Sequence, residues 1–473
     1  MLALAACGGG GGSTPDMPSG SSTLTGTLAY VVSQCHENAA GFFVHQTLMV
    51  RQGEHEPIAV MEVPDLGTTM DLLGLCRYIG TRRAEVLLAS YGALQHVAVS
   101  PDGAAVAFEL TDEFSLLGNN LLTAEQRGLF IVRADGTGLR RLGPASRHPS
   151  FITGGPYEND FDLVFSPDSR TLTFPDLGPG PDGEEAPQII ALDVATGRRT
   201  QITRLPPVGP DTNVLALAPG GLCCPFFVDN QTVGFYTQTN FEGMNPNGEV
   251  IAPLARVDGT GGVRLPPSPV ALPGSQINPR LFITRPQPTS VWLRVPGEPL
   301  NSTGPGSSIY EIFFFDGGQE LLQLTNFHRA DTHTFGGDAR RRVFLLASAN
   351  PLGTNPSENC QIFSVASLGG DLRQLTNFHE TDYSLTPCYG ASRLGLGCAI
   401  SAISQDVDTG TLVFSSSCDP FGTNPNGPQI FALGADGSGL RQLTQLRGLV
   451  TEADGTVIAE GAYPYDYSGS NPE

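Results

Sequence analysis

The stretch LRQLTNFH at residues 372–379 decides the fold of this chain, because close copies of it recur. LLQLTNFH stands at residues 321–328, and LRQLT stands at residues 440–444. Weaker copies are LRRLG at residues 139–143 and RTQIT at residues 199–203. Recurrence at intervals of roughly 50 residues predicts a chain of repeated supersecondary units.

Two hairpin signals precede the repeated stretch within a unit. SPDG at residues 100–103 and SPDS at residues 166–169 each separate two apolar runs, and DG at residues 135–136 and 436–437 separates a third run from the repeat. Pro fixes φ at the entry of a turn, and Asp-Gly tolerates positive φ. Each unit is therefore predicted to be four antiparallel strands.

Four-stranded units of this length predict an all-β fold, a β-propeller of four-stranded antiparallel blades. The tail at residues 449–467 is predicted to complete a first blade begun by residues 24–63, within one propeller over residues 24–473; such closure removes exposed sheet edges. We favour seven blades, and six are the alternative if residues 24–90 form a separate cap. Full units are expected near residues 94–143, 157–203, 212–265, 275–325, 330–376 and 380–444.

The order of these motifs resembles that of a known family. SPDG, then an apolar strand ending in Phe, then IF or IV, then DGxGLRxLT, is similar to the blade motif of TolB-type propellers over roughly residues 94–444. The motif also recurs in the propeller halves of prolyl oligopeptidase-like peptidases. The resemblance implies the propeller fold and a periplasmic envelope role, whereas the TolB propeller itself has six blades.

Composition excludes several classes of function. The net charge is −21, and all 26 basic residues are Arg. An acidic surface repels nucleic acid and anionic lipid, so neither is an expected partner. Without Lys there is no Schiff-base or P-loop lysine chemistry. No apolar stretch reaches about 20 residues, so no transmembrane helix is expected.

The start of the chain resembles a bacterial lipobox. LAAC at residues 4–7 is followed by a Gly- and Ser-rich stretch to residue 23, which suits a flexible tether. We expect Cys7 to carry a lipid. Residues 1–23 are then the remnant of a truncated signal with its lipobox, followed by the tether. Gly8 rather than Asp follows Cys7, so we expect an outer-membrane lipoprotein in the bacterial periplasm or at the cell surface, with membrane contact only through this anchor.

The other cysteines predict disulfides. Eight Cys remain after Cys7, an even number that suits an oxidising compartment. Adjacent Cys223 and Cys224 are expected to pair elsewhere, and the absence of a CxxC pair argues against zinc. Proximity leads us to predict these pairs: Cys35 with Cys76, Cys388 with Cys398, and Cys360 with Cys418.

Two further groups are candidate metal sites. His328 and His379 occupy the same place in two repeats and could share a metal, but a hydrogen-bonded His on a linker between blades is the favoured interpretation. The NPLGTNP loop at residues 350–356 matches a loop that contains the candidate Ca²⁺ ligands Asp419, Asn424 and Asn426. Asn-Pro and Asn-Gly are common turn residues, so we favour structural turns and no cofactor, with Ca²⁺ as the alternative.

The motifs do not indicate a catalytic centre. GxSxG and HExxH are absent from the sequence, and acidic pairs such as Glu158 with Asp160 and Glu184 with Glu185 are interpreted as solvated loops. We therefore predict a monomeric envelope-anchored scaffold that binds a protein or peptide partner without catalysis. The alternative is a propeller enzyme that acts on glycans or peptides through carboxylates in the central funnel.

Overall fold

The computed structural model describes a subset of the chain, and the structural statements below concern that subset. The described residues are 22–39, 41–68, 76–77, 92–112, 121–147, 163–207, 222–240, 243, 245, 251, 253–260, 262–263, 280–282, 291–296, 310–315, 322–329, 332–338, 342–378, 388, 400–406, 409–423 and 428–468. Cys7, Cys398, His379, Asn424, Asn426, Glu158 and Asp160 lie outside them. No helix in the described part of the chain is long and apolar enough to cross a membrane.

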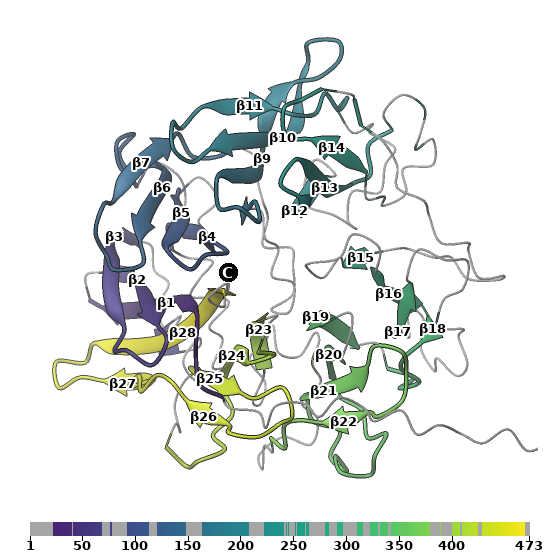
Figure 1. Cartoon of the computed structure of the whole chain (residues 1–473). Coiled ribbons are helices and arrows are strands. Elements are labelled where there is room, and N and C mark those ends of the chain that lie inside the picture. Colours follow the sequence, from purple (N-terminus) through teal and green to yellow (C-terminus); the bar gives the residue numbers. More distant parts are fainter. Residues whose placement is uncertain are drawn as a thin grey trace, which may run out of the picture.

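Six antiparallel sheets are each built from consecutive strands, and they lie around a common centre (Figure 1). Each predicted unit contains one of them. They are β4 (Leu94–Val99), β5 (Ala105–Leu110), β6 (Gly128–Arg133) and β7 (Arg140–Gly143); β8 (Val164–Phe165), β9 (Thr171–Pro179), β10 (Glu185–Asp193) and β11 (Arg199–Gln201); β12 (Leu222–Asp229), β13 (Thr232–Thr237) and β14 (Leu254–Arg256); β15 (Arg280–Phe282), β16 (Val291–Pro296), β17 (Tyr310–Phe315) and β18 (Leu322–Gln323); β19 (His333–Asp338), β20 (Arg342–Ala347), β21 (Gln361–Ala366) and β22 (Arg373–Gln374); and β23 (Ile400–Gln405), β24 (Leu412–Ser416), β25 (Gln429–Leu433) and β26 (Arg441–Gln442).

The two ends of the chain meet in a further five-stranded sheet, which we call the closing sheet. Its order is β27-β28-β1-β2-β3. Strand β28 pairs with β1 from Thr27↔Ser468 to Glu37↔Val457. The all-β propeller prediction is confirmed: six blades use consecutive strands, and the closing sheet is the seventh sheet of the ring. The bounds of its strands are β1 (Thr27–Asn38), β2 (Gly41–Gln52), β3 (Ile58–Thr68), β27 (Leu449–Thr451) and β28 (Val457–Ser468).

The SPDG motif makes the first hairpin of a blade. Ser100 Oγ accepts the N–H of Ala105 at 2.9 Å, and Gly103 has a φ of 68°, which favours glycine. In the SPDS copy, Ser166 Oγ accepts the N–H of Thr171 at 2.9 Å, and Ser169 takes a φ of 61° in place of Gly. The turn thus depends on the hydroxyl of its first residue, and both predicted hairpins are present.

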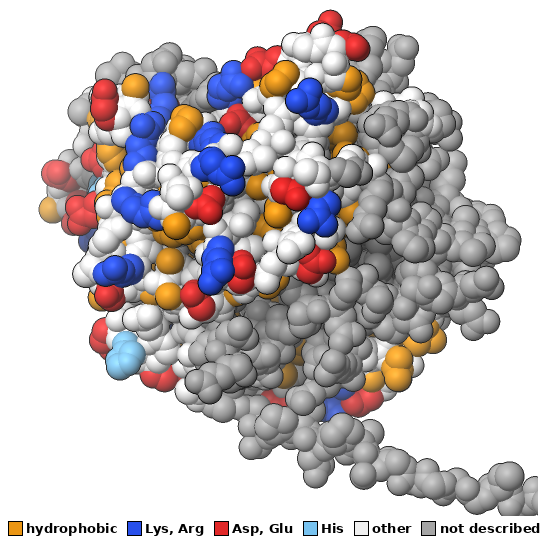
Figure 2. Space-filling view, turned by 45° about the horizontal axis from the view of Figure 1, so that its top comes forward, with side chains coloured by type: hydrophobic (Ala, Val, Ile, Leu, Met, Phe, Trp, Pro, Cys, Tyr) orange, Lys and Arg blue, Asp and Glu red, His pale blue; other side chains and the backbone are white. Residues whose placement is uncertain are grey.

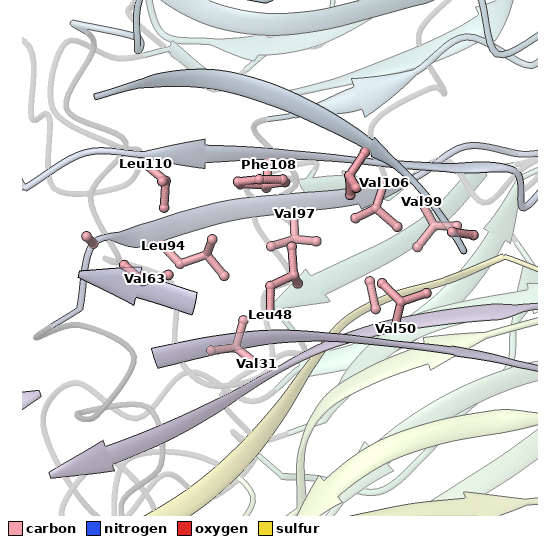
Figure 3. Close-up of a cluster of buried hydrophobic side chains, with 14 of the residues drawn as sticks. Val31, Leu48, Val50, Val63, Leu94, Val97, Val99, Val106, Phe108 and Leu110 are labelled. Atoms are coloured by element: carbon pink, nitrogen blue, oxygen red, sulfur yellow. The ribbon is translucent and has the colours of Figure 1, made fainter. Parts of the chain in front are cut away.

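Apolar side chains pack between neighbouring sheets rather than at one central core. Figure 3 shows the cluster between the closing sheet and the β4–β7 blade, where Leu48 and Val63 meet Val97 and Phe108. Phe108 and Leu48 are fully buried, and each such side chain stabilises the fold by about 1.5–3 kcal/mol. Clusters of this kind join six pairs of neighbouring sheets, and among the described residues none joins the β12–β14 blade to the β15–β18 blade.

Candidate functional site: the loop face of the ring

The antiparallel blades give the ring two unlike faces. The loops between second and third strands and the linkers between blades lie on one side, which we call the loop face. The hairpins between first and second and between third and fourth strands lie on the other side, the hairpin face. Loops held by a rigid scaffold often carry binding and catalytic residues, so both faces are candidate sites.

In four of the blades, a Thr that follows the outer strand ties this strand to its linker. Thr376 Oγ1 donates to Gln361 Oε1 at 2.7 Å and accepts the N–H of Ile362 at 2.9 Å. Gln361 Oε1 also accepts the N–H of Phe378 at 3.0 Å, while its Nε2 donates to the Phe378 carbonyl at 2.7 Å. We call this arrangement the Gln–Thr clamp. It recurs as Gln188 with Thr203 and as Gln429 with Thr444.

The β15–β18 blade has Glu311 where the other clamps have Gln. Thr325 Oγ1 donates to Glu311 Oε2 at 2.6 Å, and the N–H of Phe327 donates to the same oxygen at 3.0 Å. The second oxygen, Oε1, accepts the N–H of His328 at 2.7 Å. His328 has a φ of 55°, so the backbone turns its N–H toward a group that can only accept.

The His328 side chain is exposed on the linker after this clamp. That placement agrees with the interpretation of His328 as a linker residue, whereas His379 lies outside the described residues and the shared metal site stays untested. No three His, Cys, Asp or Glu side chains in the described part of the chain are grouped so that they could hold a metal ion.

The NPLGTNP loop is held by its two Asn side chains. Asn350 Oδ1 accepts the N–H of Asn355 at 2.8 Å, and Asn355 Nδ2 donates to the carbonyls of Ala349 at 2.9 Å and Asn359 at 2.8 Å. Asn355 is fully buried. The looser copy repeats the first bond, from the N–H of Asn245 to Asn240 Oδ1 at 3.0 Å. The Asn residues of these loops therefore act as structural turn residues.

The candidate calcium ligands are only partly placed. Asp419 Oδ1 accepts the N–H of Thr423 at 2.8 Å, as in a turn closed by an acidic side chain. Asn424 and Asn426 lie outside the described residues. The Ca²⁺ alternative is therefore a prediction that stays open, beside the structural bond that Asp419 makes.

Two disulfides are placed, and one corrects the predicted pairing. The predicted Cys35–Cys76 bridge is confirmed, with Cα atoms 5.6 Å apart. Cys388 pairs with Cys360, at a Cα–Cα distance of 4.7 Å, so the predicted Cys388–Cys398 and Cys360–Cys418 pairs are wrong. Cys418 is also disulfide-bonded. The prediction failed because sequence proximity ignored the fold, which brings the start of β21 next to the segment that contains Cys388.

A buried acid–base pair lies where the β4–β7 and β8–β11 blades meet. His96 Nδ1, on β4, is 2.7 Å from Glu109 Oε2, on β5, and both side chains are at most 15% exposed. The N–H of Ser146 donates to Glu109 Oε1, while the Ser146 hydroxyl donates to the Pro175 carbonyl at 2.7 Å. The pair lines a cavity of about 10 Å³, room for roughly one water molecule.

Charged residues reinforce the same junction. Asp176 Oδ2 is 3.2 Å from Arg199 Nη1, and the Arg199 guanidinium carbon lies 5.0 Å from the centre of the Phe174 ring. Burial lowers the pKa of Arg199, although the neighbouring Asp176 and Glu109 carboxylates oppose this shift. A second ion pair lies within the β4–β7 blade, where Asp112 accepts a hydrogen bond from Arg127 Nε at 2.6 Å. Burial raises the pKa of Asp112, but this bond and the N–H groups of Leu121 and Leu122 outweigh burial and lower the pKa.

The acidic pairs named from the sequence do not form a paired-carboxylate site in the described residues. Glu185 makes an ion pair with Arg147 at 2.7 Å, and Glu184 is exposed in the β9–β10 turn. Figure 2 shows basic and acidic side chains intermixed over the face that it displays. Such a surface suits protein recognition better than recognition of a polyanion.

Exposed apolar side chains occur at matching places on the loop face. Leu352 is 45% exposed and Phe421 is 48% exposed. They occupy the same position in the NPLGT and DPFGT loops of consecutive blades. The alignment of the two loops is visible in the sequence, and the signal for the two side chains is an apolar residue in the middle of a turn made otherwise of small and polar residues.

The N-terminal segment runs on the opposite, hairpin face. Thr27 Oγ1 donates to the Gly103 carbonyl at 2.8 Å, and Thr25 Oγ1 donates to Asp406 Oδ2 at 3.2 Å. Both acceptors belong to hairpins between first and second strands. Arg441 donates to the Ser22 carbonyl at 2.9 Å. The chain therefore enters the ring on the side away from Leu352 and Phe421.

Comparison with known proteins gives only structural similarities. No protein-family model matches the chain, and no curated protein matches its sequence. The β-propeller domain of the Trilobed protease from Pyrococcus furiosus is 11% identical, with 76% of this chain and 87% of that chain covered and a TM-score of 0.43. An acylaminoacyl peptidase from Pyrococcus horikoshii is 10% identical, with 89% and 51% covered and a TM-score of 0.48, so this chain spans about half its length.

A protein assigned as TolB from Agrobacterium tumefaciens is also similar. It is 12% identical, with 69% of this chain and 94% of that chain covered, and the TM-score is 0.34. Similarities at this level say nothing about the activity, substrates or partners of this chain.

Proposed function

We propose that this chain is an envelope-anchored propeller that binds a protein or peptide partner through its loop face and catalyses no reaction. The observation that carries the proposal is the matched exposure of Leu352 and Phe421 on equivalent loops. Exposed apolar side chains on rigid loops, rimmed by polar groups, are typical of protein-binding surfaces.

The polar groups around these loops support a binding rather than a catalytic role. Thr376 and Gln361 use their hydrogen-bonding atoms inside the clamp, and Asn355 uses its amide inside the loop. Groups engaged in this way fix the loop backbone, which lowers the entropy lost when a partner binds. We infer that the clamps serve to present the loop tips in one conformation.

The anchor and compartment are part of the same proposal. The disulfides Cys35–Cys76 and Cys360–Cys388 suit an oxidising compartment. A lipid on Cys7 would act through a tether that joins the ring at Ser22, on the hairpin face. The loop face would then point away from the membrane and stay open to a partner in the periplasm or outside the cell.

The test is capture of a partner from bacterial envelope extract with two charge-insertion variants. Leu352→Asp with Phe421→Asp removes the apolar tips of the loop face. Leu139→Asp with Leu368→Asp, at exposed positions on the hairpin face, is the matched control. We expect one stoichiometric partner with the control and at least about a tenfold loss with the loop-face variant. Equal capture by both variants would contradict the proposal.

The second candidate is a propeller enzyme, and the buried His96–Glu109 pair is the observation that favours it. A carboxylate that is hydrogen-bonded to Nδ1 can orient an imidazole so that its other nitrogen acts as a general base. The Ser146 hydroxyl proton is directed to the Pro175 carbonyl, so Ser146 is not presented to His96 as a nucleophile. Turnover of a peptide or glycan that is abolished by His96→Gln, in a folded protein, would favour the enzyme.

A further inference from the structure

The strand β3 is an unusually long sheet edge. It has 11 residues, whereas the other outermost strands β7, β11, β14, β18, β22, β26 and β27 have two to four. Among the described residues, β3 pairs with β2 alone and ends the closing sheet. Short edges give little backbone for another chain to pair with, but an 11-residue edge is a template for strand addition.

The two faces of β3 differ in chemistry. Val63 and Leu66 are buried against the β4–β7 blade, whereas Ile58, at the start of β3, is 39% exposed. Glu62 and Asp65 are exposed, and β3 contains no Arg or His. His45 Nδ1, on β2, lies 2.7 Å from Asp65 Oδ1. In the described part of the chain, the edge therefore combines backbone that pairs with no further strand with two carboxylates.

We propose that the β3 edge binds an extended, basic segment of a partner protein by adding it to the closing sheet as a sixth strand. The main chain of β3 supplies the hydrogen bonds, and Glu62 and Asp65 select Lys or Arg side chains directly opposite or diagonal to them. Pro64 has no N–H, and two register shifts, between Ala59 and Met61 and between Val63 and Leu66, interrupt the pairing of β3 with β2, so the new ladder is discontinuous. At about 3.3 Å per residue, the edge accommodates a segment of roughly ten residues.

The same charges disfavour a second copy of this chain as the occupant. Pairing of two β3 strands would place Glu62 and Asp65 of one copy beside the same carboxylates of the other, and each chain has a net charge of −21. Charged residues on edge strands prevent self-association in this way. A basic segment removes the repulsion and gains from the acidic edge.

This inference goes beyond the proposed function, because it concerns the rim of the ring rather than the loop tips at Leu352 and Phe421. The two surfaces can therefore fail separately. Loss of binding at β3 leaves the loop-face capture experiment unaffected, and the reverse also holds.

The experiment uses the full oxidised chain and three fluorescent peptides, followed by anisotropy. The probes are (Val-Lys)5, (Val-Glu)5, and (Val-Lys)5 with N-methyl groups at alternate peptide bonds, which cannot donate along one edge. We expect (Val-Lys)5 to bind, more weakly at about 0.5 M than at about 0.05 M salt. We expect at least about tenfold weaker binding of the other two, because one has the wrong charge and the other cannot form the ladder.

Two matched variants locate the site. Glu62→Lys with Asp65→Lys reverses the charges on β3, and Asp182→Lys with Glu184→Lys makes the same change of net charge in the exposed β9–β10 turn. We expect the first variant to lose at least about tenfold in affinity and the second to change less than about twofold. Hydrogen exchange of the wild-type chain should slow at residues 58–68 when (Val-Lys)5 is bound.

Three results would overturn the proposal. The first is equal weakening by the two variants, which would mean attraction by overall charge alone. The second is undiminished binding of the N-methylated peptide, which would mean that no strand is added. The third is a concentration-dependent dimer of the wild-type chain that protects residues 58–68, which would assign the edge to a second copy.

Discussion

The clamps of the β19–β22 and β15–β18 blades differ at one position, Gln361 against Glu311, and the backbone differs with it. The Gln361 amide donates to the Phe378 carbonyl, whereas the second Glu311 oxygen accepts the N–H of His328. An amide offers both a donor and an acceptor, but an ionised carboxylate only accepts. The linker of the β15–β18 blade therefore turns its N–H inward, and His328 takes a φ of 55°.

The difference shows that each linker is matched to the side chain it meets. A linker on the loop face has its course fixed by the clamp before it, so a clamp substitution should alter stability and the neighbouring backbone together. Substitutions that exchange Gln and Glu between the two clamps test whether the side chain determines the course of the linker.

The largest effect is expected for Gln361→Glu. A buried carboxylate would face the Phe378 carbonyl at the distance now occupied by a 2.7 Å hydrogen bond. We expect the free energy of unfolding to fall by about 2–4 kcal/mol, as measured by urea denaturation at neutral pH. Asn377→Asp, an exposed change of the same chemistry in the same repeat, should stay within about 0.5 kcal/mol. Equal losses of stability in Gln361→Glu and Asn377→Asp would contradict a stabilising role of the clamp.

Thr376→Val should rank second. The valine keeps the shape of the side chain but leaves the buried N–H of Ile362 and one acceptor position of Gln361 without their partner. We expect a loss of about 1–3 kcal/mol in the free energy of unfolding. Thr354→Val, at an exposed threonine of the adjacent loop, is the control, and a loss as large as that of Thr376→Val would contradict the prediction.

Glu311→Gln should cost less. The amide oxygen can still accept from Thr325 and Phe327, but the amide N–H₂ would face the N–H of His328. We expect a loss of about 1–2 kcal/mol, measured by thermal and urea unfolding with Glu184→Gln as the exposed control. A neutral result would show that the carboxylate and the backbone turn are unrelated.

The smallest effect is expected for a second substitution that restores part of the stability lost in Glu311→Gln. A positive φ is unfavourable for His but not for Gly, so His328→Gly in the Glu311→Gln background would remove the backbone strain of the linker. We expect the double variant to recover about 1 kcal/mol of the loss. A further loss of stability in the double variant would indicate that the His328 conformation is set by something other than residue 311.

The repeats and hairpins could be predicted from the sequence because their signals are local. The SPDG and Asp-Gly turns mark hairpins, and the Leu-Thr pair marks the outer strands β18, β22 and β26, so each predicted unit contains one observed sheet. The prediction that the tail completes the first blade is also confirmed, because β28 pairs with β1. That assignment followed from the need to close a ring without open edges.

The disulfide pairing and the buried pair of the β4–β7 blade depend on contacts between elements. Cys388 was assigned to its nearest neighbour in sequence, but the fold places it beside Cys360. The His96–Glu109 pair did leave a signal. Once the turn at residues 101–104 pairs Val99 with Val106, counting outward places His96 opposite Glu109.

Hydrogen–deuterium exchange of the full chain, with and without its captured partner, distinguishes binding at the loop face from binding at the hairpin face. We predict slower exchange at residues 349–355 and 417–423, the loops that present Leu352 and Phe421, and no change at the hairpins around Gly103 and Gly437. Slower exchange confined to the hairpin face, or no change at either face when the partner is bound, would contradict the assignment of the loop face as the binding surface.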